Sequence, residues 1–298
     1  MNRSFPRDGW LLLFPPLFWA INTVVGRALA GHFPPLALTF GRWTLAFLIL
    51  LPFAARALRR HQDVLLQHWK ATLALAVLGV GLYNSLLYTA LVTSPPVNVL
   101  LIGATAPSFV LVVQAVIDRR FPGGMAVLAT LLSIGGVVAV GSQGDPSRLL
   151  HLQFAQGDLV MMLATMVWVA YTLVLRRARP PVPMTPLLLA QIGIGVLLLL
   201  PAFLAEWLLF QPVMVLDPPV LASLVYVGIF PSIVAYLCWD RGVAAAGATV
   251  AVVLANLAPV IAAVLAWIFL GEPIGLQHLV AATMIFTAIW LSTRASQA

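Results

Sequence analysis

The chain has 298 residues, of which 62% are hydrophobic and only 8% are charged. Soluble domains carry about 25% charged residues, so the composition excludes a soluble globular protein and indicates an integral membrane protein. The formal charge of +7 does not indicate a nucleic-acid partner, because the basic residues lie in short loops between apolar segments. Cys238 is the single cysteine, which excludes an intramolecular disulfide, and the five histidines show no metal-ligand spacing.

Ten apolar segments of about 20 residues each predict ten transmembrane helices, joined by short connections that often contain Pro or Gly. The predicted spans are residues 9–29, 35–56, 70–91, 95–117, 123–141, 157–176, 185–207, 218–240, 246–270 and 275–293. Arg3 and Arg7 ahead of the first span resemble the start of a signal peptide, but this apolar run is too long for one. We therefore expect an all-α integral membrane fold.

Basic residues lie almost entirely on one side of this predicted topology. Thirteen of the 16 Lys and Arg residues fall on the side of the two termini, Arg148 falls on the other side, and Arg27 and Arg42 lie near or within helix ends. Cytoplasmic loops carry an excess of Lys and Arg. Both termini are therefore expected in the cytoplasm, and Arg27 is interpreted as a span-end residue without a functional role.

The two halves of the chain repeat one pattern. "FWAINTVVGR" (18–27) matches "VWVAYTLVLR" (167–176) at an offset of 149, which pairs Trp19 with Trp168 and Arg27 with Arg176. "GATAPSFVLVVQAVI" (103–117) matches "ANLAPVIAAVLAWIF" (255–269) at an offset of 152, so that the two Ala-Pro pairs coincide. We predict a duplication, with one five-helix repeat at residues 1–145 and a second at residues 146–298.

A duplicated unit of five spans enters the membrane from opposite sides, because five is odd. Inverted-topology repeats of this kind are typical of secondary transporters, which bind substrate near the bilayer midplane between the repeats. Each repeat can then adopt the conformation of the other, which opens the site alternately to the two sides. A channel or a scaffold with the same symmetry remains an alternative.

The motifs of the two halves resemble the drug/metabolite transporter superfamily, in its EamA-type branch. The second half reads "AAAGATVAVVLANLAPVIAAVLAWIFLGEPI" (244–274), with a small-residue turn, an Ala-Pro inside the helix and a closing Gly-Glu-Pro. The first half has the turn at Thr93-Ser94 and the pair Ala106-Pro107, but it ends in Asp118-Arg119-Arg120 where Gly-Glu is usual. This departure puts a shared role of the Gly-Glu pair in doubt for the first half.

The resemblance implies a carrier of small organic metabolites, commonly an exporter of amino acids across the bacterial inner membrane. Its aromatic amino-acid branch is favoured here by the aromatic residues described next. We expect a small-molecule substrate, a surrounding lipid bilayer, and no cofactor, metal, nucleic acid or obligate protein partner.

Two matching helix faces carry aromatic and polar side chains at helical spacing. They consist of Trp19, Asn22 and Thr23 in the first half and Trp168, Tyr171 and Thr172 in the second. Each tryptophan lies about ten residues into its span, or roughly 15 Å deep at 1.5 Å per residue, which places it near the midplane. Polar groups in lipid face the bundle or a watery cavity, so the two faces are predicted to line a central substrate cavity. Helix packing is the alternative.

A second set of side chains has the right spacing for further lining faces. It consists of Tyr83, Asn84 and Tyr88 in the third span and Tyr236 and Trp239 in the eighth. Tyr236 is interpreted as the repeat equivalent of Asn84. Interhelical hydrogen bonding is an equal alternative for polar residues of this kind, and Trp10, Trp69, Trp207 and Trp290 near span ends are interpreted as interfacial belt residues.

Arg42 is the most unusual charge, because it lies about seven residues into the second span. A buried arginine can clamp a substrate carboxylate with paired hydrogen bonds, which suits an amino acid. The alternative is a structural anchor that snorkels or bonds to helix carbonyls. Its repeat equivalent is the neutral Gln191.

The acidic residues all lie in loops or near span ends: Asp8, Asp63, Asp118, Asp145, Asp158, Glu206, Asp217, Asp240 and Glu272. Ion-coupled carriers usually hold a carboxylate within the membrane, so we expect transport down the substrate's own gradient, or exchange, without tight ion coupling. An enzyme is not expected, because H-E-x-x-H, G-x-S-x-G, a P-loop and paired carboxylates are missing from the sequence. The stronger alternative is a channel-like or facilitative pore for small polar metabolites or cationic drugs.

Overall fold

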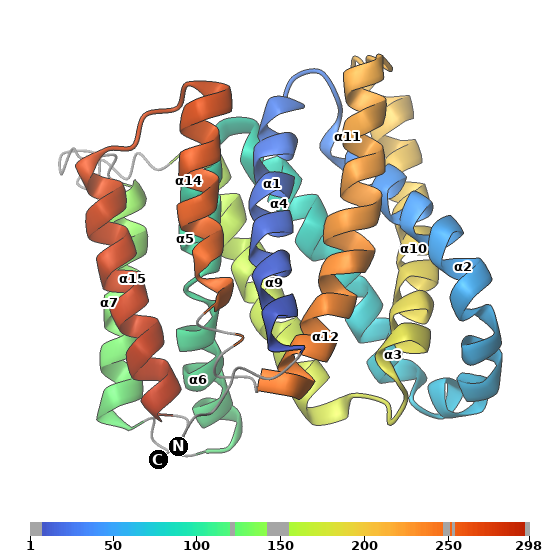
Figure 1. Ribbon diagram of the computed structural model, residues 1–298, viewed down its shortest axis with the longest axis horizontal. Coiled ribbons are helices and arrows are strands. Elements are labelled where there is room, and N and C mark those ends of the chain that lie inside the picture. Colours follow the sequence, from blue (N-terminus) through green and yellow to red (C-terminus); the bar gives the residue numbers. More distant parts are fainter. Residues whose placement is uncertain (1–7, 120–122, 142–154, 247–250, 252–253, 296–298) are drawn as a thin grey trace.

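The computed structural model describes residues 8–119, 123–141, 155–246, 251 and 254–295, and every regular element within these residues is helical. The chain runs back and forth between two faces of a helical bundle (Figure 1). The face at which α1 (Phe14–Ala28) begins and α15 (Leu276–Ala295) ends is named the terminal face, and the face at which α1 ends is named the opposite face.

The remaining helices follow in chain order. They are η1 (Gly9–Leu13), α2 (Pro35–Gln67), α3 (Trp69–Leu75), η2 (Ala76–Leu82), α4 (Tyr83–Thr93), α5 (Pro96–Gly103), α6 (Ala106–Ile117), α7 (Gly124–Gly141), α9 (Gln156–Ala178), α10 (Met184–Phe210), α11 (Pro218–Ile229), η3 (Phe230–Val234), α12 (Ala235–Ala246) and α14 (Leu257–Leu270).

Seven of the described helical passes are long and apolar enough to cross a membrane. They are Gly9–Ala28, Pro35–Gln67, Trp69–Thr93, Pro96–Ile117, Gln156–Ala178, Met184–Phe210 and Pro218–Ala246. Three further apolar helices, Gly124–Ala139, Leu257–Leu270 and Leu276–Leu291, are shorter. Described helices therefore lie within all ten predicted spans, and seven helical passes have the length and composition of a membrane span. Residues 247–250 and 252–253 of the predicted span 246–270 lie outside the described residues.

Prolines mark the places where the passes begin or change geometry. Pro15, Pro107 and Pro259 lie in the first turns of α1, α6 and α14, where a missing N–H removes no helical hydrogen bond. Pro231 instead lies inside η3, a π-helical segment between α11 and α12. A second π-helical segment, η2, joins α3 to α4. Short π-helical segments are rare and often lie at functional sites.

Much of the core lies between the two halves of the chain. Helix α2 packs on α10 at one end of the bundle and α7 packs on α15 at the other, with α1, α4 and α9 between them (Figure 1). Helix α1 also packs on α14, and α6 packs on α9. Each of these pairs joins a helix from residues 9–141 to a helix from residues 156–295.

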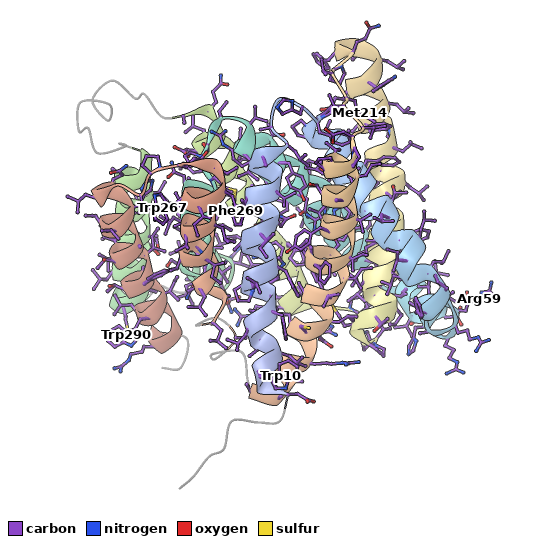
Figure 2. The ribbon with its side chains drawn as sticks, turned by 45° about the horizontal axis from the view of Figure 1, so that its top comes forward. Trp10, Arg59, Met214, Trp267, Phe269 and Trp290 are labelled. Atoms are coloured by element: carbon purple, nitrogen blue, oxygen red, sulfur yellow. The ribbon has the colours of Figure 1, made fainter. Side chains whose placement is uncertain are left out.

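Large apolar side chains cover the outside of the bundle, as a lipid environment requires. Trp10, Trp69, Trp207 and Trp290 are exposed, and Trp10 and Trp290 both lie toward the terminal face in Figure 2. Their exposure agrees with the interfacial positions that the sequence predicts for them.

Candidate functional site

Arg42 lies where α1, α2, α4 and η3 meet, and it is 2% exposed. Its Nε and Nη2 donate to Ser232 Oγ at 2.9 and 2.7 Å. Its Nη1 donates to Tyr88 Oη at 2.7 Å, to Asn84 Oδ1 at 3.0 Å and to Asn22 Oδ1 at 3.3 Å. The Tyr88 hydroxyl in turn donates to Asn22 Oδ1 at 2.6 Å. These five residues form the Arg42 cluster, and four of them are predicted site residues.

The two π-helical segments orient the acceptors of this cluster. Asn84 Nδ2 donates to the Gly79 carbonyl at 2.8 Å, and Ser232 Oγ donates to the Val227 carbonyl at 2.7 Å, each across five residues. Because the amide N–H of Asn84 and the O–H of Ser232 donate to these carbonyls, the two side chains present only acceptors to Arg42: Oδ1 of Asn84 and the lone pairs of Ser232 Oγ. The local backbone geometry therefore orients two of the four acceptors of the guanidinium, Asn84 and Ser232.

The charge of Arg42 has no acidic partner among the described residues, which include eight of the nine acids. The described ion pairs join other residues, Arg27 to Glu272 and Arg177 to Asp118. Neutral oxygens and the ring of Trp43, 4.8 Å from the guanidinium carbon, surround Arg42 instead. A buried charge of this kind is unfavourable unless hydrogen bonds or an opposite charge offset its desolvation.

Two hydrogen-bond donors at this place are unused in the described part of the chain. Nη2 of Arg42 carries two hydrogens but makes a single bond, to Ser232. The indole Nε1 of Trp43 is buried and has no partner. Buried donors without partners cost about 1–3 kcal/mol each, so an added acceptor would stabilise either donor.

The predicted aromatic residues form separate contacts around this cluster. Trp168 contacts Tyr83 and Tyr171 at ring-centroid distances of 4.8 and 4.9 Å. Trp19 contacts Trp239 at 5.6 Å. Tyr236 meets Trp43 edge to face at 6.5 Å, so the aromatic residues of η3–α12 reach the ring that covers Arg42.

The two predicted threonines do not join these contacts. The Thr23 hydroxyl donates to the Ala20 carbonyl, and the Thr172 hydroxyl donates to the Trp168 carbonyl, both at 2.8 Å within their own helices. Such back-bonding satisfies the hydroxyl without a partner from another helix. The threonines therefore add no polar contact between helices, and Trp19 and Trp168, which lie on the same helix faces, make aromatic contacts.

The π-helical segments change the predicted relation between the two halves. The sequence comparison made Tyr236 the equivalent of Asn84, but the matching side-chain bonds relate Asn84 to Ser232, at an offset of 148. The same offset relates Tyr88 to Tyr236. Ser232 was not among the predicted site residues, and its position beside Pro231 is the sequence signal for it.

Gln191, which the sequence comparison matches to Arg42, is also buried. Gln191 is 2% exposed, and its Nε2 has no hydrogen-bond partner among the described residues. Trp43, which the sequence analysis did not single out, covers Arg42 and belongs to a core cluster with Leu188 and Ile192 of α10.

A second polar cluster lies at the opposite face. Asp158 in the first turn of α9 is 1% exposed and accepts from Ser94 Oγ at 2.7 Å and from Asn98 Nδ2 at 3.4 Å. His278 Nδ1 accepts from the Gly275 N–H, so its Nε2 carries the proton that reaches Asn98 Oδ1 at 3.0 Å. Asp158 is thus near a span end, as predicted, but it is buried rather than in a solvated loop.

Comparison with known proteins agrees with a polytopic helical membrane protein. The model of the EamA-like transporter family matches residues 9–142 and 155–294. The chain therefore belongs to the EamA-like transporter family, and it is a multi-pass membrane transporter.

Relatives of this chain carry the same general description. It is 24% identical over 286 residues to the uncharacterized transporter YyaM of Bacillus subtilis (strain 168), covering 94% of this chain and 91% of that protein. It is also 24% identical over 285 residues to an uncharacterized transporter of Archaeoglobus fulgidus, covering 95% and 96%. A crystal structure with 20% identity superposes with a TM-score of 0.62 over 100% of this chain and 99% of that one, which supports the fold alone.

Proposed function

We propose that this transporter moves a small organic molecule bearing a carboxylate, with an amino acid as the favoured class, by alternating access. The observation that carries the proposal is Arg42, a buried cation with no acidic partner among the described residues and with one N–H unused. A carboxylate offers both the charge and the acceptor that this arrangement lacks. The rings of Trp43, Trp168 and Tyr83 nearby favour a substrate with an aromatic or other apolar side chain.

Alternating access is supported by the relation between the two halves. The family model matches two segments of similar length, which correspond to the proposed five-helix repeats at 1–145 and 146–298. Their main helix pairs, α2 with α10 and α7 with α15, join equivalent passes of the two halves. The proposal includes ten passes, and the excess of basic residues beside the termini supports a location in the bacterial inner membrane with both termini in the cytoplasm.

Purified protein in liposomes tests this proposal. Labelled aromatic, aliphatic and polar amino acids are offered for counterflow, and each is competed with its unlabelled form and with its carboxamide, which lacks the negative charge. We expect saturable exchange that the free amino acid inhibits and the carboxamide does not. Arg42→Gln should lower this flux by about tenfold or more, whereas Arg59→Gln, on an exposed position of α2, should leave it unchanged.

Other outcomes separate the alternatives. Equal competition by the carboxamide removes the proposed role of Arg42 in recognising a carboxylate. Fast flux that does not saturate favours a pore. Flux that stops when the proton gradient is collapsed, at constant substrate gradient, contradicts transport down the substrate's own gradient.

A further inference from the structure

Two side-chain ion pairs lie at opposite faces of the described bundle. Arg27 Nε, near the end of α1, is 2.8 Å from Glu272 Oε1, just beyond the end of α14. Arg177 Nη2, near the end of α9, is 2.6 Å from Asp118 Oδ1 at the end of α6. Since α1 and α14 end at the opposite face and α6 and α9 end at the terminal face (Figure 1), each face has one pair.

The two pairs lie at corresponding helix ends of the proposed repeat, although their residues do not align position by position. Arg27 matches Arg176 in the duplicated sequence, and Arg177 is the next residue. Glu272 and Asp118 follow α14 and α6, the two helices that begin with the matching Ala-Pro pairs. Asp118 lies two residues before the position that aligns with Glu272, so the acid follows the matching helix without occupying the position of the Gly-Glu motif. Each pair also joins one half of the chain to the other.

The pair at the opposite face is embedded in further contacts. Arg27 Nη1 also donates to the carbonyls of Leu91 and Val92 at the end of α4, at 3.0 and 2.8 Å. Gly271, with a φ of 67°, ends α14 and turns the chain so that Glu272 follows directly. The side chains of Arg27 and Glu272 are 27% and 20% exposed.

The pair at the terminal face is simpler and more open to solvent. The side chains of Arg177 and Asp118 are 38% and 42% exposed. Arg177 also lines a surface hollow with residues 67–71 at the α2–α3 junction. Exposed ion pairs are individually weak, so this pair opens more easily than the one at the opposite face.

We propose that these two ion pairs are alternating latches, which position the two halves during transport so that one face opens only while the other is held closed. The proposal rests on the alternating-access function proposed above. It assigns roles to Arg27, Asp118, Arg177 and Glu272 that are outside the Arg42 cluster. Both ion pairs are formed in the structure, which under this proposal corresponds to a state occluded from both sides.

Amide hydrogen exchange on the purified full-length protein in lipid nanodiscs tests the latches without a substrate. Breaking one latch should shift the ratio of the two open states by about two- to fivefold. Glu272→Gln should therefore raise exchange at residues 91–98, at the opposite face, and lower it at residues 114–119, at the terminal face. Asp118→Asn should produce the reverse pattern. The exchanged pair Asp118→Arg with Arg177→Asp should restore the wild-type pattern.

Arg176→Gln is the matched control, because this exposed neighbour of Arg177 makes one 3.4 Å bond to Gln114 and no ion pair. It should leave exchange at both faces unchanged. If each mutation raises exchange at its own face without lowering it at the far face, the pairs are local structural contacts and the latch proposal is overturned. If the Glu272→Gln variant does not fold, the exchange pattern of the Asp118→Asn variant alone tests the latch proposal. The exchange experiment measures no flux. Its failure would therefore overturn the latches alone, whereas failure of the liposome assay would overturn the proposed substrate transport.

Discussion

The hydroxyl of Tyr88 bridges two other members of the Arg42 cluster. It accepts from Arg42 Nη1 at 2.7 Å and donates to Asn22 Oδ1 at 2.6 Å, so it couples α4 to both α1 and α2. Tyr88 is also 2% exposed, and its ring lies 5.6 Å from the guanidinium carbon. Water is therefore not available to replace either bond.

We predict that Tyr88→Phe lowers the free energy of unfolding by about 1.5–3 kcal/mol, the range for a hydrogen bond to a charged group. Equilibrium unfolding in mixed micelles measures this change. Tyr226→Phe is the matched control, because the Tyr226 hydroxyl makes one neutral bond, to the Phe18 carbonyl at 3.4 Å, on a half-buried side chain. Equal losses for the two variants would contradict a special role for the Tyr88 hydroxyl.

Sequence patterns predicted part of this cluster, for a physical reason. Asn22, Arg42 and Asn84 are polar residues within apolar spans, and such residues must find partners inside the bundle. Apart from its neighbour Pro231, Ser232 gave no signal of this kind, because a serine hydroxyl in a helix often bonds to its own backbone. Its hydroxyl does so here, yet its lone pairs also accept from Arg42. The helical period could not reveal this, since the π-helical turn shifts the register of the side chains that follow.

At the scale of elements, the sequence predicted the positions of the helices better than the interruptions within them. Apolar runs of about 20 residues define spans, and most of the described helical passes begin and end within a few residues of the predicted bounds. The interruption between α5 and α6 at residues 104–105, and the π-helical segments η2 and η3, depend on tertiary contacts instead. The extension of α2 to Gln67 is likewise beyond what apolar length alone predicts.

The contact between α4 and α9 gives a prediction at this scale. Gly157, in the first turn of α9, lies directly against the end of α4, and its N–H donates to Thr93 Oγ1 at 2.8 Å. A Cβ at this position would overlap the Ala90 carbonyl oxygen and the Ser94 hydroxyl. Backbone cannot move aside as a flexible side chain can, so the two helices must separate.

We therefore predict that Gly157→Ala destabilises the protein by about 1–3 kcal/mol or more, the usual range for overpacking a tight interface. Thermal unfolding in detergent, followed by loss of monodisperse protein, measures it. Gly124→Ala at the start of α7 is the control, since a Cβ there meets nothing within 4 Å. That change should be neutral or slightly stabilising. A tolerated Gly157→Ala would mean that α4 and α9 pack less closely than described.

At the scale of the whole molecule, the number of membrane crossings decides where the termini lie. The seven long helices alone would place the two ends of the chain on opposite sides of a membrane, because seven is odd. If the three shorter apolar helices also cross, the total of ten places the ends on the same side. The arrangement in space favours ten, since α1 begins and α15 ends at the same face (Figure 1).

We predict that both termini lie in the cytoplasm, because thirteen of the 16 basic residues belong to the terminal side of the predicted topology. Fusions of alkaline phosphatase and of a fluorescent protein to each end measure this, because the first is active only outside the cytoplasm and the second fluoresces only inside it. Fluorescence without phosphatase activity is expected at both ends. Opposite results at the two ends would support an odd number of crossings, and the inverted five-helix repeats, with their paired latches, would then be wrong.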